Sequence, residues 1–127
     1  MNEIKEVRFA HAEDEAPIRS LIETMLPRIF KGYNVKLDQA DNGLTLVRLA
    51  SENQYDGLIT DNNMEGGDGV DALEQIRSLG INTPALFTSG RVDQDLRDRV
   101  MRISNVYMLN KPFDLLDLSN KIKEVWP

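Results

Sequence analysis

Five short apolar runs alternate along this chain with segments of helical spacing, and this alternation limits the possible fold more than any other feature. The runs have the length of β-strands and lie at residues 7–12, 34–39, 55–60, 84–89 and 106–109. In the segments that follow them, apolar residues recur every three or four positions, which is typical of helices with one buried face. Strands that alternate with helices form a parallel sheet with helices on both faces. The pattern therefore predicts one doubly wound α/β domain over residues 1–127, and periodicity alone leaves the strand order open.

Individual residues mark where these helices begin and end. Pro17 suits the first turn of the first helix, and Pro27 is expected to end or kink it. Asp68 and Asp114 are placed to cap two later helices, and Gly80 is placed to end the first of these two. Their inward faces are predicted to carry Val70, Leu73, Ile76 and Leu79 in one helix and Leu115, Leu118, Ile122 and Val125 in the other.

Composition excludes several classes of function. The 127 residues include 15 Lys and Arg against 21 Asp and Glu, and the formal net charge is −6. Such a chain is not expected to bind nucleic acid through its phosphates, which requires clustered positive charge. The absence of cysteine excludes disulfides and thiolate chemistry. Charged residues interrupt the amino terminus, and no apolar run reaches membrane-spanning length, so a cytoplasmic protein without membrane contact is expected.

Polar and charged residues stand where four of the predicted strands end. Glu13 and Asp14 follow the first strand, Asp61 follows the third, Thr88 lies at the end of the fourth, and Lys111 follows the fifth. In an open α/β sheet, ligands bind beyond the carboxyl ends of the strands. If the first and third strands are neighbours, the three carboxylates and the Lys111 ammonium converge on one pocket. Hard oxygen ligands of this kind are suited to Mg²⁺.

These residues carry a resemblance that covers essentially the whole chain. Glu13-Asp14, Asp61 followed by Met64 and Asp68-Gly69, then Thr88, and then Lys111-Pro112-Phe113 resemble the receiver domain of two-component response regulators, in particular the stand-alone regulators of chemotaxis. The resemblance implies a flavodoxin-like sheet of order 2-1-3-4-5. It also implies a signalling switch rather than an enzyme, although such a switch can assist its own phosphorylation and dephosphorylation.

The resemblance assigns a role to each matched residue. Asp61 is implied to accept a phosphoryl group from a histidine kinase or a histidine phosphotransfer protein. Asp14, Asp61 and the backbone carbonyl of Asn63 are implied to bind Mg²⁺, and Glu13 to act through a metal-bound water. Thr88 and Lys111 are implied to bind the phosphoryl group, and a change at the fourth helix and fifth strand to signal to a downstream protein target.

Several residues depart from the family pattern. Met108 stands three residues before Lys111, where an aromatic switch residue is usual, and Tyr107 is expected on the opposite face of its strand. Arg8 and His11 interrupt the first strand, and His11 is expected to be a buried, hydrogen-bonded core residue rather than a phosphate relay. These departures leave phosphoacceptance intact. They keep open a pseudo-receiver, which would bind partners without being phosphorylated.

Two enzyme or cofactor functions fit the sequence less well. A haloacid-dehalogenase-type phosphatase needs a second aspartate two residues after the first, and here that residue is Asn63. A flavodoxin-like cofactor binder needs a hydroxyl- and glycine-rich phosphate loop after the first strand, where this chain has the acidic segment EDEAP. The length leaves no room for an output domain, so we expect a stand-alone receiver or an excised domain.

Overall fold

The computed structural model describes residues 5–90 and 93–127, and within them it contains the five predicted strands and the five predicted helices. The strands are β1 (Lys5–Ala12), β2 (Tyr33–Ala40), β3 (Gly57–Asp61), β4 (Ala85–Ser89) and β5 (Val106–Asn110). The helices are α1 (Ala16–Ile29), α2 (Gly43–Glu52), α3 (Gly69–Ser78), α4 (Gln94–Met101) and α5 (Leu115–Val125).

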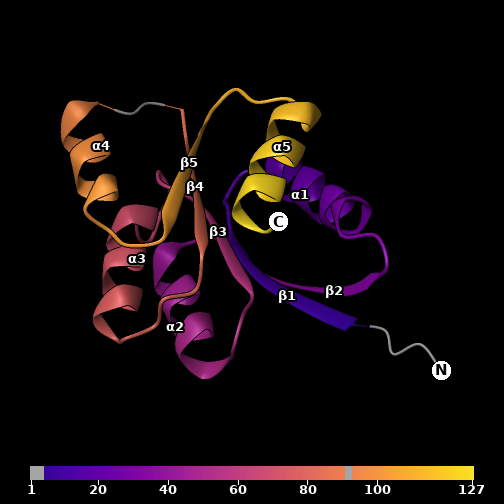
Figure 1. Ribbon diagram of the computed structural model, residues 1–127. Coiled ribbons are helices and arrows are strands. Elements are labelled where there is room, and N and C mark those ends of the chain that lie inside the picture. The colour runs from indigo at the N-terminus through magenta and orange to yellow at the C-terminus, as the bar shows by residue number, and fades with distance from the viewer. Residues whose placement is uncertain (1–4, 91–92) are drawn as a thin grey trace.

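All four strand pairs are parallel, and the sheet order is β2-β1-β3-β4-β5. This confirms both the doubly wound class and the order implied by the resemblance. Figure 1 shows α2, α3 and α4 on one side of the sheet and α1 and α5 on the other. The strand order reverses at β1, because β2 lies on one side of it and β3 on the other. The carboxyl end of β1 is therefore a topological switch point, where this class of sheet binds ligands.

The two faces of the sheet bury separate apolar clusters. Along β3, Leu58 packs toward α2, α3 and α4, whereas Ile59 packs toward α1 and α5. Along β4, Phe87 and Leu86 divide in the same way. Successive side chains of a strand point to opposite faces, so a strand buried on both sides is apolar throughout. This is why β3 and β4 read as continuous apolar runs in the sequence.

Some of the predicted helix details are confirmed and others are wrong. Asp114 caps α5 in a reciprocal capping box with Asp117, whereas Asp68 precedes α3 without a capping bond from its side chain. Leu79 and Leu115 were predicted to face inward and are instead 57% and 47% exposed. Both lie at helix ends, where the apolar stripe has already turned away from the sheet. Helix α1 continues two residues past Pro27 before it ends at Ile29.

Arg8 has a structural explanation within β1. Its guanidinium donates to Asp38 Oδ2 at 3.1 Å and to Asn53 Oδ1 at 3.2 Å, and it lies 5.1 Å from the centre of the Tyr55 ring. The Tyr55 hydroxyl donates to the same Asp38 oxygen at 2.7 Å. This polar network links the side chains of β1 and β2 to Asn53 and Tyr55 in the segment before β3, in addition to the backbone pairing of the sheet.

Candidate functional site

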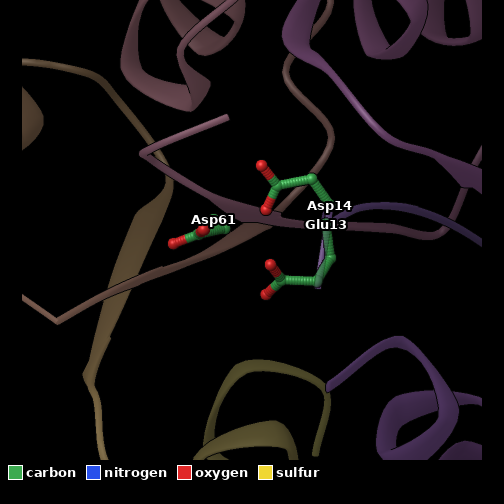
Figure 2. Close-up of side chains that lie close together, drawn as sticks. All are labelled: Glu13, Asp14 and Asp61. Carbon is green, nitrogen blue, oxygen red and sulfur yellow. The ribbon is translucent and has the colours of Figure 1, made fainter. Parts of the chain in front are cut away.

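Three carboxylates converge at the carboxyl ends of β1 and β3. Glu13 and Asp14 directly follow β1, and Asp61 is the last residue of β3. One oxygen from each lies within 4.8 Å of the others. Figure 2 shows the Glu13 and Asp14 side chains directed from the end of β1 toward Asp61. Glu13 is 0% exposed and Asp61 is 5% exposed, whereas Asp14 lies at the surface.

Lys111 supplies the positive charge at this cluster. Its Nζ lies 3.2 Å from Glu13 Oε1 and 3.2 Å from Asp61 Oδ1, with Glu15 Oε2 at 3.9 Å. The backbone N–H of Lys111 donates to the carbonyl of Ser89 at 2.9 Å, which fixes the start of the β5–α5 connection against β4. One ammonium therefore bridges carboxylates from two strands that are far apart in the sequence.

Burial and like charge make this cluster unfavourable for anions. Burial, followed by the nearby Asp61 charge, raises the pKa of Glu13 to about 7 against the opposing effect of Lys111. Burial also raises the pKa of Asp61, again against the opposing effect of Lys111. For Lys111 itself, burial disfavours the ammonium, but the Asp61 and Glu13 carboxylates outweigh this and its pKa is raised. The site thus has more buried negative charge than one cation stabilises.

Backbone contacts hold Glu13 in place. Its N–H donates to the Ala40 carbonyl at the end of β2 at 2.9 Å, and its own carbonyl accepts from the Arg19 guanidinium at 3.3 Å. The Glu15 N–H donates to Glu13 Oε2 at 3.3 Å. The buried carboxylate is therefore positioned by β2, by α1 and by the turn between β1 and α1.

Asn62 closes the loop that follows Asp61. This side chain is 7% exposed and its Oδ1 accepts from the Val70 N–H at 3.2 Å, while its backbone carbonyl accepts from Gly69 at 3.0 Å. A Cβ on Gly69 would lie 2.0 Å from the carbonyl oxygen of Asp61, so only glycine permits this approach. The start of α3 is thus bound directly against the end of β3, and Asn63 lies in the loop between them.

Thr88 lies beside Asp61. The two residues are paired in the β3–β4 register, and Thr88 is 3% exposed. Its hydroxyl donates to the Thr60 carbonyl at 3.4 Å, a long hydrogen bond to the backbone of the neighbouring strand. The hydroxyl is therefore next to the carboxylate and weakly held.

The donor set fits a hard divalent cation. Carboxylate oxygens from Glu13, Asp14 and Asp61 lie close enough to contribute to one site, and oxygen ligands are those that Mg²⁺ prefers. A cation there would also offset the repulsion that raises the pKa values of Glu13 and Asp61.

Two of the residues that depart from the family pattern, Met108 and Tyr107, lie on β5, whereas His11 lies on β1 two residues before Glu13. Met108 pairs with Phe87 and packs partly buried against the cluster beneath α2, α3 and α4. The Tyr107 side chain is 37% exposed, in agreement with the prediction that it lies on the face of its strand opposite to Met108. His11 is 2% exposed, and burial, Lys111 and Arg19 lower its pKa to about 3. It is a buried core residue as predicted, but its Nδ1 lacks a hydrogen-bond partner among the described residues, so the predicted hydrogen bonding fails at this nitrogen.

The structure brings together the residues that the sequence marked at the four strand ends, and it adds contacts that the sequence did not reveal. Nothing in the sequence signals that Arg19 binds the Glu13 carbonyl or that Asn62 closes the loop. Each depends on strand order or on a backbone turn. The acidic turn after β1 and the aspartate at the end of β3 were the recognisable signals.

Comparison with known proteins agrees with this geometry. The family model described as the response regulator receiver domain matches residues 10–123. The uncharacterized transcriptional regulatory protein YbdJ of Bacillus subtilis is 32% identical over 124 residues, which is 96% of this chain and 52% of that protein. The chain spans about half the length of several such curated relatives.

Other relatives match this chain over almost their full length. The chemotaxis protein CheY-3 of Vibrio cholerae is 25% identical over 125 residues, covering 96% of this chain and 93% of that protein. The solved structure of the chemotaxis response regulator CheY4 of Vibrio cholerae has a TM-score of 0.81 at 21% identity, covering 95% of this chain and 99% of that one. At that identity, the structural likeness concerns the fold.

The charge imbalance generates a stability prediction for the metal-free protein. Asp61→Asn should leave the free energy of unfolding unchanged or raise it, because it removes a buried charge whose pKa is raised and leaves Lys111 paired with Glu13. Lys111→Gln should lower it by about 2 kcal/mol, because two carboxylates lose their shared cation. Urea denaturation of both variants in a chelator measures the two effects. The reverse order of stability would show that Asp61 is a structural residue.

Proposed function

The chain belongs to the response regulator receiver domain family, and from this premise we propose that it is a phosphoacceptor switch in a two-component phosphorelay. Asp61 is the proposed acceptor, and residues 1–127 are proposed to form a single receiver domain. The observation that carries the proposal is the position of the Asp61 carboxylate, which ends β3 beside Lys111 and close to the carboxylates that follow β1. Response regulators interact with histidine kinases or phosphotransfer proteins, and such a protein is the proposed donor here.

The proposed reaction transfers a phosphoryl group to an oxygen of Asp61. A bond forms between that oxygen and phosphorus while the bond from phosphorus to the donor's leaving group breaks. Charge spreads over the phosphoryl oxygens during this step, so the site must mainly position and neutralise them. Lys111 Nζ, 3.2 Å from Asp61 Oδ1, is placed to neutralise this charge, and the Thr88 hydroxyl on the adjacent strand is placed to donate a hydrogen bond.

Proteins of this family bind Mg²⁺ at an acidic pocket, and the grouped carboxylates of this chain match that requirement. We propose Asp14, Asp61 and the backbone carbonyl of Asn63 as ligands, with Glu13 acting through a bound water. When bound, the ion would neutralise charge on the carboxylates and on the phosphoryl oxygens. Loss of Lys111 would therefore impair neutralisation of the phosphoryl group, and loss of a carboxylate would impair binding of Mg²⁺.

The direct test is phosphorylation by a small donor. Incubation with acetyl phosphate and Mg²⁺ should increase the intact mass by one phosphoryl group, because Asp61 lies at the carboxyl end of β3 close to the surface residue Asp14, and the cation offsets the repulsion among the carboxylates. Intact mass spectrometry measures the labelled fraction.

Two controls decide the assignment. The same incubation with a chelator should leave the mass unchanged, as should incubation of Asp61→Asn with Mg²⁺. An unlabelled wild type in the presence of Mg²⁺ would contradict phosphoacceptance, and a labelled Asp61→Asn would contradict the choice of residue.

We propose that Thr88 transmits the phosphorylation of Asp61 to the surface formed by α4 and β5. The weak Thr88 hydrogen bond to Thr60 is readily exchanged for one to a phosphoryl group. Met108 is paired with Phe87 on the neighbouring strand. Its unbranched side chain would then repack into the changed space without the rotamer change that an aromatic residue would need. The resulting change would present the surface to a downstream protein target. The proposed setting is the cytoplasm without direct contact to nucleic acid, which the acidic net charge supports.

Amide chemical shifts can test the switch. Addition of beryllofluoride and Mg²⁺ should shift resonances from Thr88 to Leu109 in the wild type, and Thr88→Ala should lose most of these shifts while retaining those around Asp61. Ser89 and Gly90 begin the loop expected to move, and Arg91 lies outside the described residues. If beryllofluoride shifts only the resonances around Asp61 in the wild type, the α4 and β5 surface is not coupled to the phosphorylation site. That result would favour the pseudo-receiver function.

A further inference from the structure

A groove of about 280 Å³ lies at the end of the molecule opposite the carboxylates. It is lined mainly by Ile29, Phe30, Lys31, Tyr33, Lys123 and Trp126. Tyr33 begins β2, where it pairs with the first residue of β1, and the other residues come from the carboxyl-terminal ends of α1 and α5. In a parallel sheet with crossover helices, this end is the one away from the ligand-binding edge. The groove is therefore separate from the proposed phosphorylation site.

Aromatic rings form the wall of this aromatic groove. The Phe9 ring packs against Phe30 at 5.4 Å and edge-on against Trp126 at 4.9 Å, and Phe30 meets Tyr33 at 6.2 Å. The Trp126 indole N–H donates to the Asp56 carbonyl at 2.9 Å, which fixes the orientation of the ring. The groove is thus preformed, which lowers the entropy cost of binding.

Gly57 makes this arrangement possible. A Cβ at Gly57 would lie 2.3 Å from the Phe9 ring and 2.4 Å from the Trp126 ring. The absence of a side chain at the start of β3 therefore lets both rings reach the backbone. Tyr33 nevertheless remains 46% exposed, so part of the aromatic surface is left for another molecule.

The charge of the aromatic groove is opposite to that of the whole chain. Lys31 and Lys123 line it together with Pro127, and among residues 5–90 and 93–127 no Asp or Glu side chain does so. Neither lysine forms an ion pair within the described ranges 5–90 and 93–127, where the neighbouring Lys121 takes Glu124 as its partner. The chain as a whole carries a net charge of −6. An aromatic wall with two unpaired ammonium groups complements an acidic ligand that also presents an apolar side chain.

We propose that the aromatic groove is a docking site for an acidic peptide segment of a partner protein, with an aromatic or aliphatic side chain inserted between Tyr33 and Trp126. The acidic side chains of the partner would pair with Lys31 and Lys123. This binding is independent of Asp61, so it would add a second recognition surface to the protein. Lysines at helix carboxyl ends also stabilise the helix dipole, and the experiment must separate that role from docking.

Trp126 provides a direct measurement because it is the only tryptophan in the chain. The probe is a blocked peptide of four glutamates around one phenylalanine, titrated into the unphosphorylated protein while tryptophan fluorescence is recorded. We expect a saturable change, and no change with a peptide in which glutamine replaces each glutamate. The Lys31→Glu, Lys123→Glu double variant should weaken the binding by at least about tenfold.

The matched control is the Arg48→Glu, Arg102→Glu double variant, which makes the same change in net charge at exposed positions of α2 and at the end of α4. It should change the affinity by less than about twofold, since exposed charges farther than a Debye length are screened. Equal weakening by both double variants would reduce the effect to net charge and overturn the proposal. If the Lys31→Glu, Lys123→Glu variant melts at a lower temperature but binds the acidic peptide normally, the two lysines serve helix stability alone and the proposal is overturned.

Anionic lipid is the competing ligand for a basic aromatic surface. Vesicles of phosphatidylglycerol should leave the fluorescence unchanged under the same conditions. A response to vesicles without a response to the acidic peptide would overturn the proposal in favour of a membrane surface. Because none of these titrations uses a phosphodonor, their failure leaves the proposed phosphoacceptor function untouched, and failure of Asp61 phosphorylation leaves the docking result untouched.

Discussion

Two almost fully buried carboxylates, Glu13 and Asp61, share the single ammonium of Lys111, and the functional end of the molecule is arranged around this imbalance. Burial raises the pKa of both acids, so the folded chain pays an electrostatic cost to hold them together. The backbone contacts of Glu13 with Ala40 and Arg19 hold one of the acids, and the tight approach of Gly69 to Asp61 fixes the other. A structure that holds like charges together in this way is prepared to bind a cation.

The sheet order determines which residues meet at that end. Because β1 lies between β2 and β3, the acidic turn after β1 is brought beside Asp61, and Thr88 is brought beside it by the β3–β4 register. The same topology sends the carboxyl ends of α1 and α5 to the opposite end, where Phe30 and Trp126 pack on Phe9. One parallel sheet therefore separates an acidic site from an aromatic, basic groove.

Much of this arrangement could be predicted from the sequence. The spacing of apolar residues and the polar residues at strand ends are local signals that can be recognised without a structure. The buried runs of β3 and β4, the acidic turn at Glu13 and the cap at Asp114 are all readable in this way. The sheet order came from the resemblance, since periodicity does not encode which strands are neighbours. The exposed Leu79, the unpaired His11 nitrogen and the Arg19 contact with the Glu13 carbonyl could not be predicted, because each depends on where a helix end or side chain lies in three dimensions.

Calorimetric titration with Mg²⁺ measures whether the strand-end carboxylates form one Mg²⁺ site. We expect one saturable site in the wild type, at least about tenfold weaker binding in Asp14→Asn and Asp61→Asn, and little change in Glu65→Gln, which removes an exposed charge from the loop that follows Asp61. Unchanged affinity in Asp14→Asn and Asp61→Asn, or equal weakening in Glu65→Gln, would show that these carboxylates do not form a shared Mg²⁺ site.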